Sequence, residues 1–223
     1  DTYAGSAKDA LTIAAKALEI YTVRFAPYPY TEFDVVSTPM LALGIEYPGI
    51  TGIRMELYDP KGEVSDTPAP VLLESVIVHE VAHQWFYNIV GNDEIDEPWL
   101  DEAVVQYATG LYYRDRYGRS AEQSYRQSWN SRWERVGKEE IPIGLPSGAY
   151  EPEAYGAIVY GRGPLFVDAL AETMGEATFE AFMRDYVAEY RWGVATAEDF
   201  RAQAEAHCDC DPAPLFETWV EQQ

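Results

Sequence analysis

Residues 76–86 read VIVHEVAHQWF and contain the pattern H-E-x-x-H. On an α-helix, side chains four residues apart lie on the same face, one turn above the other. His79 and His83 therefore project side by side, and two imidazoles so placed can hold one metal ion. Glu80 lies beside them as a carboxylate that can take the proton of a metal-activated water. The apolar flanks indicate a buried helix, which we expect over about residues 71–90.

The pattern alone is weak evidence, because a histidine on a helix usually packs or faces solvent and H-E-x-x-H also occurs by chance. Here only three histidines are present, and two of them form the pattern. A third ligand follows at Glu102, after the eighteen residues 84–101, which suffice to end one helix and begin another that packs back on it. Two histidines and one glutamate leave the fourth zinc position open, as in a catalytic site. Taken alone, Glu102 would be an ordinary acid in the first turn of a helix.

This spacing, with Glu102 inside the segment WLDEA, resembles the M1 family of zinc aminopeptidases, which belongs to the gluzincin metallopeptidases. The resemblance implies one zinc ion held by His79, His83 and Glu102, with Glu80 as the general base. It also implies a thermolysin-like catalytic domain that acts on peptide substrates.

The resemblance covers nearly the whole chain. Residues 25–36 resemble the opening of the family's catalytic domain, and residues 197–200 and 216–220 resemble its closing helices. The long β-rich domain that usually precedes the catalytic domain in the family has no counterpart here. We therefore expect such a domain, in the parent protein, among the partners of this chain.

A glycine-containing segment before the metal motif is a candidate for binding substrate. Gly44 would let the backbone approach a ligand, and the carboxylate of Glu46 could bind a cationic amino terminus. An ordinary turn between strands is an equally good reading of these residues. The M1 family has a G-x-M-E-N segment here, whose glutamate grips the free α-amine, and Glu46 matches it. Leu43, Ile45 and Tyr47 replace its Gly, Met and Asn.

A tyrosine hydroxyl near the metal can donate a hydrogen bond to a developing oxyanion. The chain has 17 tyrosines, and composition cannot choose among them, since most tyrosines pack with a solvated hydroxyl. The resemblance does choose: the family's catalytic tyrosine precedes an x-[KR]-G-like segment, and Tyr160 precedes Gly161, Arg162 and Gly163. Tyr155, five residues earlier, is a second candidate for the cleft.

Two cysteines, Cys208 and Cys210, follow His207 near the end of the chain. With one residue between them, a disulfide would be strained. A second metal site with His207 is conceivable, but tetrahedral zinc sites usually use a longer cysteine spacing. We therefore expect a polar loop before the last helix.

Composition bounds the remaining possibilities. The 223 residues suffice for one sizeable core, and the net charge of −22 argues against nucleic acid and anionic membranes as partners. No apolar run approaches the length of a membrane span. The chain begins at Asp1 without Met, so we expect a mature product or an excised domain. Nothing in the sequence indicates the compartment, the oligomeric state or the preferred side chain at the cleavage site.

The coarse pattern indicates an α+β fold in one domain over residues 1–223. We expect a small, mostly antiparallel sheet within about residues 1–70 and a helical body over about 71–223. Ser6 is the expected N-cap of a first helix that ends before Pro27. The expected strands are 33–37 and 53–58, and further helices are expected at about 98–117, 120–136, 164–174, 178–190 and 196–207, with a short final one.

The function that these patterns and the resemblance to the M1 family together imply is zinc-dependent removal of amino-terminal residues from peptides. Glu80, Tyr160 and Glu46 would then serve as general base, oxyanion donor and amine anchor. Two alternatives stay open. One is a zinc endopeptidase of the same class, and the other is a zinc-bound binding module without turnover.

Overall fold

The computed structural model describes residues 3–221 of the chain. The chain divides after Asn88 into two compact units, unit 1 and unit 2. The helix that carries the metal motif thus belongs to the same unit as the first sheet. The expected single domain, with parts divided near residue 70, remains a prediction.

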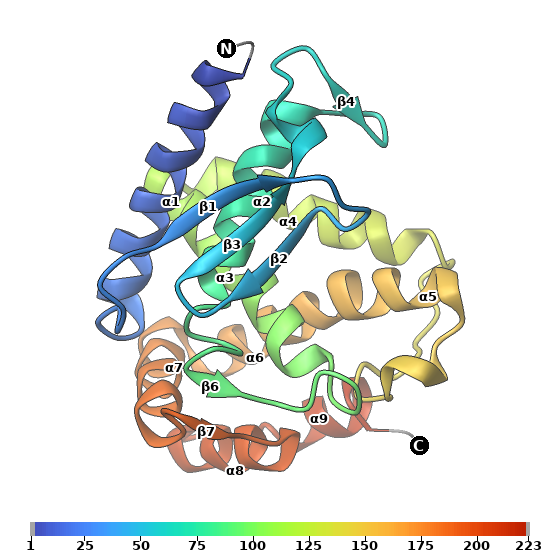
Figure 1. Ribbon diagram of the computed structural model, residues 1–223. Coiled ribbons are helices and arrows are strands. Elements are labelled where there is room, and N and C mark those ends of the chain that lie inside the picture. Colours follow the sequence, from blue (N-terminus) through green and yellow to red (C-terminus); the bar gives the residue numbers. More distant parts are fainter. Residues whose placement is uncertain (1–2, 222–223) are drawn as a thin grey trace. The chain divides into compact units, whose positions relative to one another are not determined.

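Unit 1 combines two helices with a small sheet. Its elements are α1 (Ala4–Arg24), β1 (Asp34–Thr38), β2 (Gly44–Tyr47), β3 (Ile50–Arg54), the 3-10 turn η1 (Met55–Tyr58), β4 (Glu63–Val64), β5 (Thr67–Pro68) and α2 (Ala69–Ala82). The two helices pack on each other, and β2 and β3 contact α2 (Figure 1). The helix α1 begins at Ala4 with Tyr3 as its N-cap, so Ser6 is a buried residue of the helix and not the expected cap.

The main sheet of unit 1 is mixed, and the expectation of a mostly antiparallel sheet is wrong. Its strand order is β1-β3-β2, with β1 parallel and β2 antiparallel to β3. The loop after β1 carries the chain past the place of β3, which then inserts between its two predecessors. The expected strand 53–58 also differs: β3 ends at Arg54, and η1 follows. Ile53 and Leu57, both completely buried, are four residues apart, which is helical spacing.

Unit 2 is predominantly helical. Its elements are β6 (Val90–Gly91), α3 (Trp99–Tyr117), α4 (Arg119–Glu134), the 3-10 turn η2 (Ser147–Ala149), α5 (Pro152–Ala157), the π-helical turn η3 (Ile158–Arg162), α6 (Gly163–Met174), α7 (Glu176–Glu189), β7 (Gly193–Val194), α8 (Ala197–His207) and α9 (Ala213–Trp219). The helix α3 is buried along most of its length and packs against α4 and α6. The chain therefore has the expected mixture of helix-rich body and small sheets.

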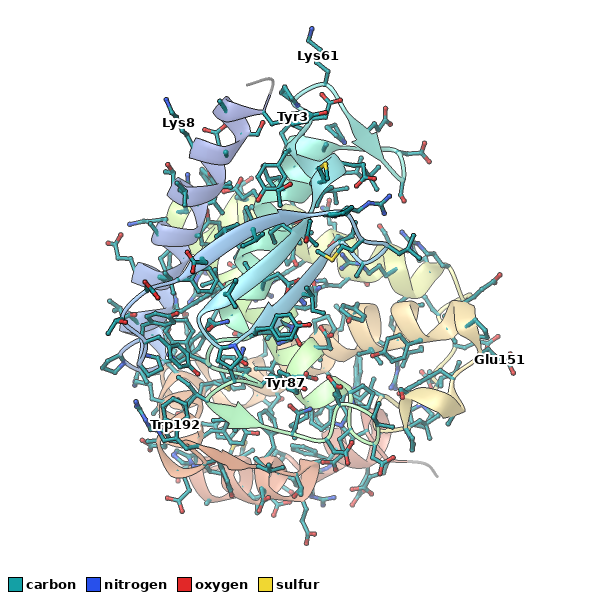
Figure 2. All side chains as sticks on the ribbon, in the orientation of Figure 1. Tyr3, Lys8, Lys61, Tyr87, Glu151 and Trp192 are labelled. Carbon is teal, nitrogen blue, oxygen red and sulfur yellow. A yellow bond between two sulfur atoms is a disulfide. The ribbon has the colours of Figure 1, made fainter. Side chains whose placement is uncertain are left out.

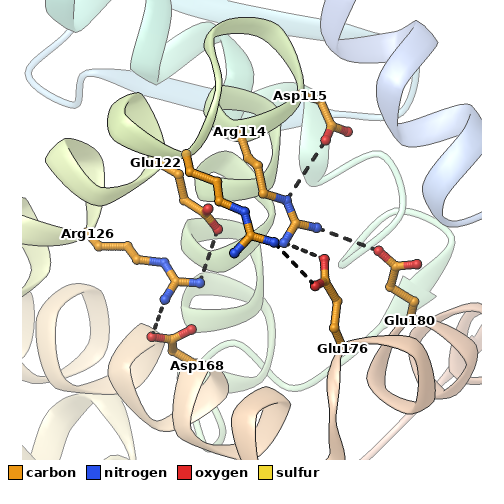
Figure 3. Close-up of polar contacts among 8 residues, drawn as sticks. Arg114, Asp115, Glu122, Arg126, Asp168, Glu176 and Glu180 are labelled. Carbon is orange, nitrogen blue, oxygen red and sulfur yellow. Dashed lines mark hydrogen bonds and ion pairs between the residues drawn. The ribbon is translucent and has the colours of Figure 1, made fainter.

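Buried and half-buried charges connect the helices of unit 2. Arg126 of α4 donates to Asp168 of α6 at 2.6 Å and to Glu122 of its own helix at 3.1 Å (Figure 3). Arg114 of α3 pairs with Glu176 of α7 at 2.7 Å. The pairs Arg126–Asp168 and Arg114–Glu176 join helices distant in sequence, and Arg126 and Arg114 are each largely shielded from water.

Charged side chains of both signs lie on the surface. Lys8 and Lys61 point away from unit 1, and Glu151 points away from unit 2 (Figure 2). Within residues 3–221, every helix is too short or too polar to cross a bilayer.

The expected polar loop near the end of the chain contains a disulfide, which joins Cys208 and Cys210. Their Cα atoms are 4.9 Å apart, inside the range that disulfides span. The second metal site has no support: the thiols are oxidised, and His207 places its Nε2 2.9 Å from Asp185 and its Nδ1 2.9 Å from the Gln203 carbonyl.

Candidate active site

The two histidines of H-E-x-x-H converge as the motif predicts. His79 lies in the last turn of α2, and His83 follows the helix with helical dihedral angles. Their Nε2 atoms are 3.2 Å apart. Two nitrogens on one tetrahedral zinc, each at about 2.05 Å, would be about 3.3 Å apart. The pair therefore fits a shared metal ion.

The ring of His83 is held in the orientation that a ligand needs. Its Nδ1 lies 3.0 Å from the carbonyl oxygen of Phe86, which can only accept, so Nδ1 is the donor. In the neutral ring the proton is then on Nδ1, and Nε2 keeps its lone pair for a metal. Hydrogen bonds of this kind fix the tautomer of metal-binding histidines.

Two carboxylates of unit 1 gather at the same place. Oxygen atoms of Glu46 and Glu80 and a ring nitrogen of His83 all lie within 4.8 Å of one another. Glu80 is buried, and Glu46 is half-buried. Gly44, on the same strand as Glu46, is in close contact with Glu80: a Cβ atom built on Gly44 would lie 2.1 Å from Glu80 Oε1. We call His79, Glu80, His83 and Glu46 the histidine half-site.

The segment of Gly44 and Glu46 is a strand, β2, and not a turn between strands. It pairs with β3 through Glu46 and Thr51 and packs on α2. The pairing sets Glu46 on the face of the sheet that carries the completely buried Thr51. Gly44 serves less as a flexible joint than as a place where the strand comes close to a side chain.

Glu102 and Tyr160 pair with each other in unit 2. Glu102 lies in the first turn of α3 and its Oε1 accepts a hydrogen bond of 2.5 Å from the Tyr160 hydroxyl. Burial, reinforced by the Glu102 carboxylate, raises the pKa of Tyr160 far above its ordinary value. The phenol is therefore a neutral donor throughout the working pH range. We call Glu102 and Tyr160 the tyrosine half-site.

Tyr160 lies on the π-helical turn η3, a type of distortion found frequently at functional sites. Tyr155 lies one turn earlier, on α5, with its ring centroid 6.1 Å from that of Tyr160. Burial, with the charge of Glu102 as a lesser cause, raises the pKa of Tyr155 to about 12. Both tyrosines therefore keep their protons at neutral pH.

Three residues that hydrogen-bond near the half-sites have no positioning role in the expectations drawn from sequence. Arg132 donates to the Tyr160 carbonyl at 3.3 Å, and the buried Arg162 donates to the carbonyls of Trp219 at 2.7 Å and Thr218 at 3.1 Å. Gln84 is completely buried beside His83. Only Gln84 leaves a signal in the sequence: an amide inside an apolar run must find hydrogen-bond partners.

The chain is similar to known proteins in both sequence and structure. A family model described as Peptidase family M1 domain matches residues 9–219. Aminopeptidase M1 of Arabidopsis thaliana is 28% identical over 238 residues, which cover 99% of this chain and 26% of that protein. Aminopeptidase B of Mus musculus is 27% identical over 187 residues, covering 79% of this chain and 27% of that protein. The chain thus spans about a quarter of the length of these curated relatives.

Solved structures give the same picture. The M1 zinc metallopeptidase from Deinococcus radiodurans matches with a TM-score of 0.74 and 25% identity, over 94% of this chain and 43% of that chain. A mutant of that enzyme bound to a Tyr-Ser-Ala substrate matches with a TM-score of 0.73 and 25% identity, over 93% and 43% of the two chains. The helix-rich mixture of helices and small sheets is therefore the one found in M1 metallopeptidase structures.

Proposed function

Because the chain belongs to peptidase family M1, we propose that it is the thermolysin-like catalytic part of a zinc aminopeptidase. In this proposal, the histidine half-site and the tyrosine half-site serve one reaction, the removal of amino-terminal residues from peptides. The observation that carries it is the convergence of the two Nε2 atoms, 3.2 Å apart, beside the Glu80 and Glu46 carboxylates.

His79, His83 and Glu102 are the proposed ligands of one zinc ion. The donor set supports this choice, because two neutral imidazoles and one carboxylate form a catalytic zinc site with a position left open. The hydrogen bond from His83 Nδ1 to Phe86 supports it further, since it leaves Nε2 as the ligating atom. A bound zinc ion supplies Lewis acidity, which acidifies water and polarises a peptide carbonyl.

Glu80 is the proposed general base and acid. Its buried carboxylate accepts the proton of the attacking water, and then delivers a proton to the nitrogen of the leaving amine. The contact with Gly44 supports this role, because it confines the carboxylate on the side of β2.

Tyr160 is the proposed donor to the oxyanion that forms as the carbonyl is attacked. Its raised pKa keeps the hydroxyl protonated, so the hydroxyl can donate a hydrogen bond without first gaining a proton. Tyr155, one turn away, is the proposed neighbour of the substrate in the same region.

Glu46 is the proposed anchor of the substrate's amino terminus, with Gly44 beside it. A carboxylate within 4.8 Å of both Glu80 and His83 can bind an ammonium group one residue from the scissile bond. Such an anchor would make the enzyme release one residue at a time.

The test is hydrolysis of an unblocked leucyl fluorogenic amide beside its amino-acetylated twin, with and without a chelator. Chelator-sensitive cleavage of the unblocked substrate alone is the expected result. Cleavage of both substrates would identify an endopeptidase of the same zinc class. Cleavage of neither, by protein that contains zinc by elemental analysis, would favour a binding module without turnover.

A further inference from the structure

Gln84 is the residue after the second histidine of the metal motif, and its side chain is completely buried. It lies in the tightened turn that follows α2, where its backbone N–H donates to Val81 at 3.1 Å. A buried amide needs partners for both its oxygen and its nitrogen, because a buried polar group left without a partner destabilises the folded protein. In unit 1, both ends of the Gln84 amide find their partners on one turn of the sheet.

The turn in question joins β2 to β3. Gln84 Nε2 donates to the carbonyl of Tyr47 at 3.0 Å, and the N–H of Gly49 donates to Gln84 Oε1 at 2.9 Å. Tyr47 is the last residue of β2, and Gly49 directly precedes β3. One side-chain amide therefore spans the whole turn.

The turn between β2 and β3 has a backbone conformation that does not by itself hold the two strands together. Pro48 followed by Gly49 at φ +76° has the residue pattern of a type II turn. In a two-residue hairpin, a type II turn opposes the natural twist of the strands and splays them apart. Within the described part of unit 1, β2 pairs with β3 alone. Besides this ladder and its packing on α2, the end of β2 is held by the two hydrogen bonds of Gln84.

The position of β2 determines the position of Glu46, which directly precedes Tyr47. The Glu46 carboxylate lies within 4.8 Å of Glu80 and His83. Gln84 is bonded covalently to His83 and by hydrogen bonds to the end of β2. It therefore links a metal-binding residue to the strand that carries the amine anchor.

We propose that Gln84 is a positioning residue, which fixes β2 so that the Glu46 carboxylate stays at a constant distance from the metal-binding histidines. The inference rests on the proposed function in assigning amine binding to Glu46. Its consequence is that Gln84 sets the preference for peptides with a free amino terminus, although it touches neither the metal nor the substrate.

The decisive variant is Gln84→Met, which keeps the length of the side chain and removes both hydrogen bonds. We expect the KM for the unblocked leucyl amide to rise about tenfold, which corresponds to 1.4 kcal/mol, while kcat changes less than about threefold. The preference for the unblocked over the acetylated substrate should fall by the same factor. Zinc content should not change, and amide hydrogen exchange in residues 44–50 should become faster.

Trp85→Phe is the matched control. Trp85 is the next residue, is also completely buried, and donates from Nε1 to the Ala26 carbonyl at 2.8 Å, away from the sheet. This variant should lose thermal stability yet keep the KM, the substrate preference and the exchange rates of residues 44–50.

Gln84→Glu provides a rescue. Burial favours the neutral carboxyl, which has both an acceptor oxygen and a donor hydroxyl and can replace the amide. At the acidic end of the activity range, Gln84→Glu should therefore keep the wild-type KM. Its KM should rise above the wild-type value as increasing pH ionises the carboxyl and removes the donor to Tyr47.

Failure of this inference differs from failure of the proposed function. If the wild-type protein shows no chelator-sensitive hydrolysis, the proposed function is wrong, and hydrogen exchange alone decides the role of Gln84. Faster exchange of residues 44–50 in Gln84→Met, but not in Trp85→Phe, would support the positioning role. Unchanged exchange, or unchanged KM and preference in an active protein, would overturn it.

Discussion

The two half-sites are held in place by different kinds of interaction: regular secondary structure for the histidine half-site and long-range side-chain contacts for the tyrosine half-site. In the histidine half-site, His79, Glu80 and His83 are set by the period of α2 and by the turn that continues it. Glu46 comes from a strand that lies on the same helix. Each of these positions follows from regular backbone hydrogen bonding, and the Gln84 side chain adds two hydrogen bonds from the end of the helix to the end of the strand.

The tyrosine half-site depends on long-range side-chain contacts. Glu102 and Tyr160 are 58 residues apart, and Tyr160 lies on a π-helical turn. Two arginines hold this turn: the half-buried Arg132 donates to the carbonyl of Tyr160, and the buried Arg162 donates to the carbonyls of Thr218 and Trp219. A motif can therefore specify the first half-site, whereas the second requires the packed helices of unit 2.

The sharpest test of the histidine half-site is Glu80→Gln. We expect kcat to fall about 10³-fold, because the change removes the proton acceptor and keeps the size of the side chain. Metal binding should persist, since the imidazoles are untouched. Steady-state kinetics with zinc analysis would check both points, and a variant with wild-type kcat would remove Glu80 from its proposed role.

For the tyrosine half-site, the corresponding variant is Tyr160→Phe. Loss of one oxyanion donor should lower kcat about 10²-fold with little change in KM. Tyr155→Phe is the control, because Tyr155 lies in the same region but is proposed only as a neighbour of the substrate. Equal losses of kcat in the two variants would show that Tyr160 has no special role in the oxyanion step.

Gly44→Ala tests whether the close approach of β2 to Glu80 is needed for catalysis. The added methyl would lie 2.1 Å from Glu80 Oε1, and the carboxylate is the flexible partner that must move. We therefore expect kcat to fall about tenfold, equivalent to 1.4 kcal/mol, while thermal stability stays nearly unchanged. Denaturation and kinetics on the same samples would separate the two effects, and a stability loss without a kinetic change would contradict the prediction.

This division explains what could be predicted from the sequence. The start of α2 and both ends of α3 lie close to their expected positions, although α2 ends at Ala82 and not near residue 90, and the convergence of His79 with His83 follows from spacing alone. The contact between Gly44 and Glu80 could not be predicted, because both readings of the segment, a substrate-binding loop and an ordinary turn, place it between strands, whereas it is the strand β2. The expectation of a mostly antiparallel sheet is wrong for a related reason, since local sequence does not show which strand will insert between two others.

The hydrogen-bond partners of the buried Arg162 could not be predicted from the sequence for a different reason. Arg162 was noted only as a neighbour of Tyr160, yet it is completely enclosed and satisfies carbonyl groups near the end of α9. The location of an arginine's partners is set by tertiary packing, and no period in the sequence records it.

Asp168→Asn distinguishes an effect on the stability of unit 2 from an effect on catalysis. Burial, opposed in part by Arg126, raises the pKa of Asp168 to about 6 from an ordinary value of 3.8, while nearby Glu172 and Glu122 raise it further. The folded protein thus holds a proton here that the unfolded chain releases between about pH 4 and pH 6. The contribution of Asp168 to stability should therefore decrease as the pH rises through this window.

The asparagine cannot ionise, and its amide oxygen can still accept from Arg126. From pH 4 to pH 7 the free energy of unfolding of Asp168→Asn should therefore increase relative to that of wild type, so that the variant gains relative stability, by at most about 3 kcal/mol at 1.36 kcal/mol per pKa unit. Denaturant unfolding at several pH values measures this difference. Among the variants discussed, Asp168→Asn should change the rate of hydrolysis at neutral pH the least, because Asp168 belongs to neither half-site. If the difference in unfolding free energy between the variant and wild type does not change with pH, then Arg126 cancels the effect of burial on the pKa of Asp168.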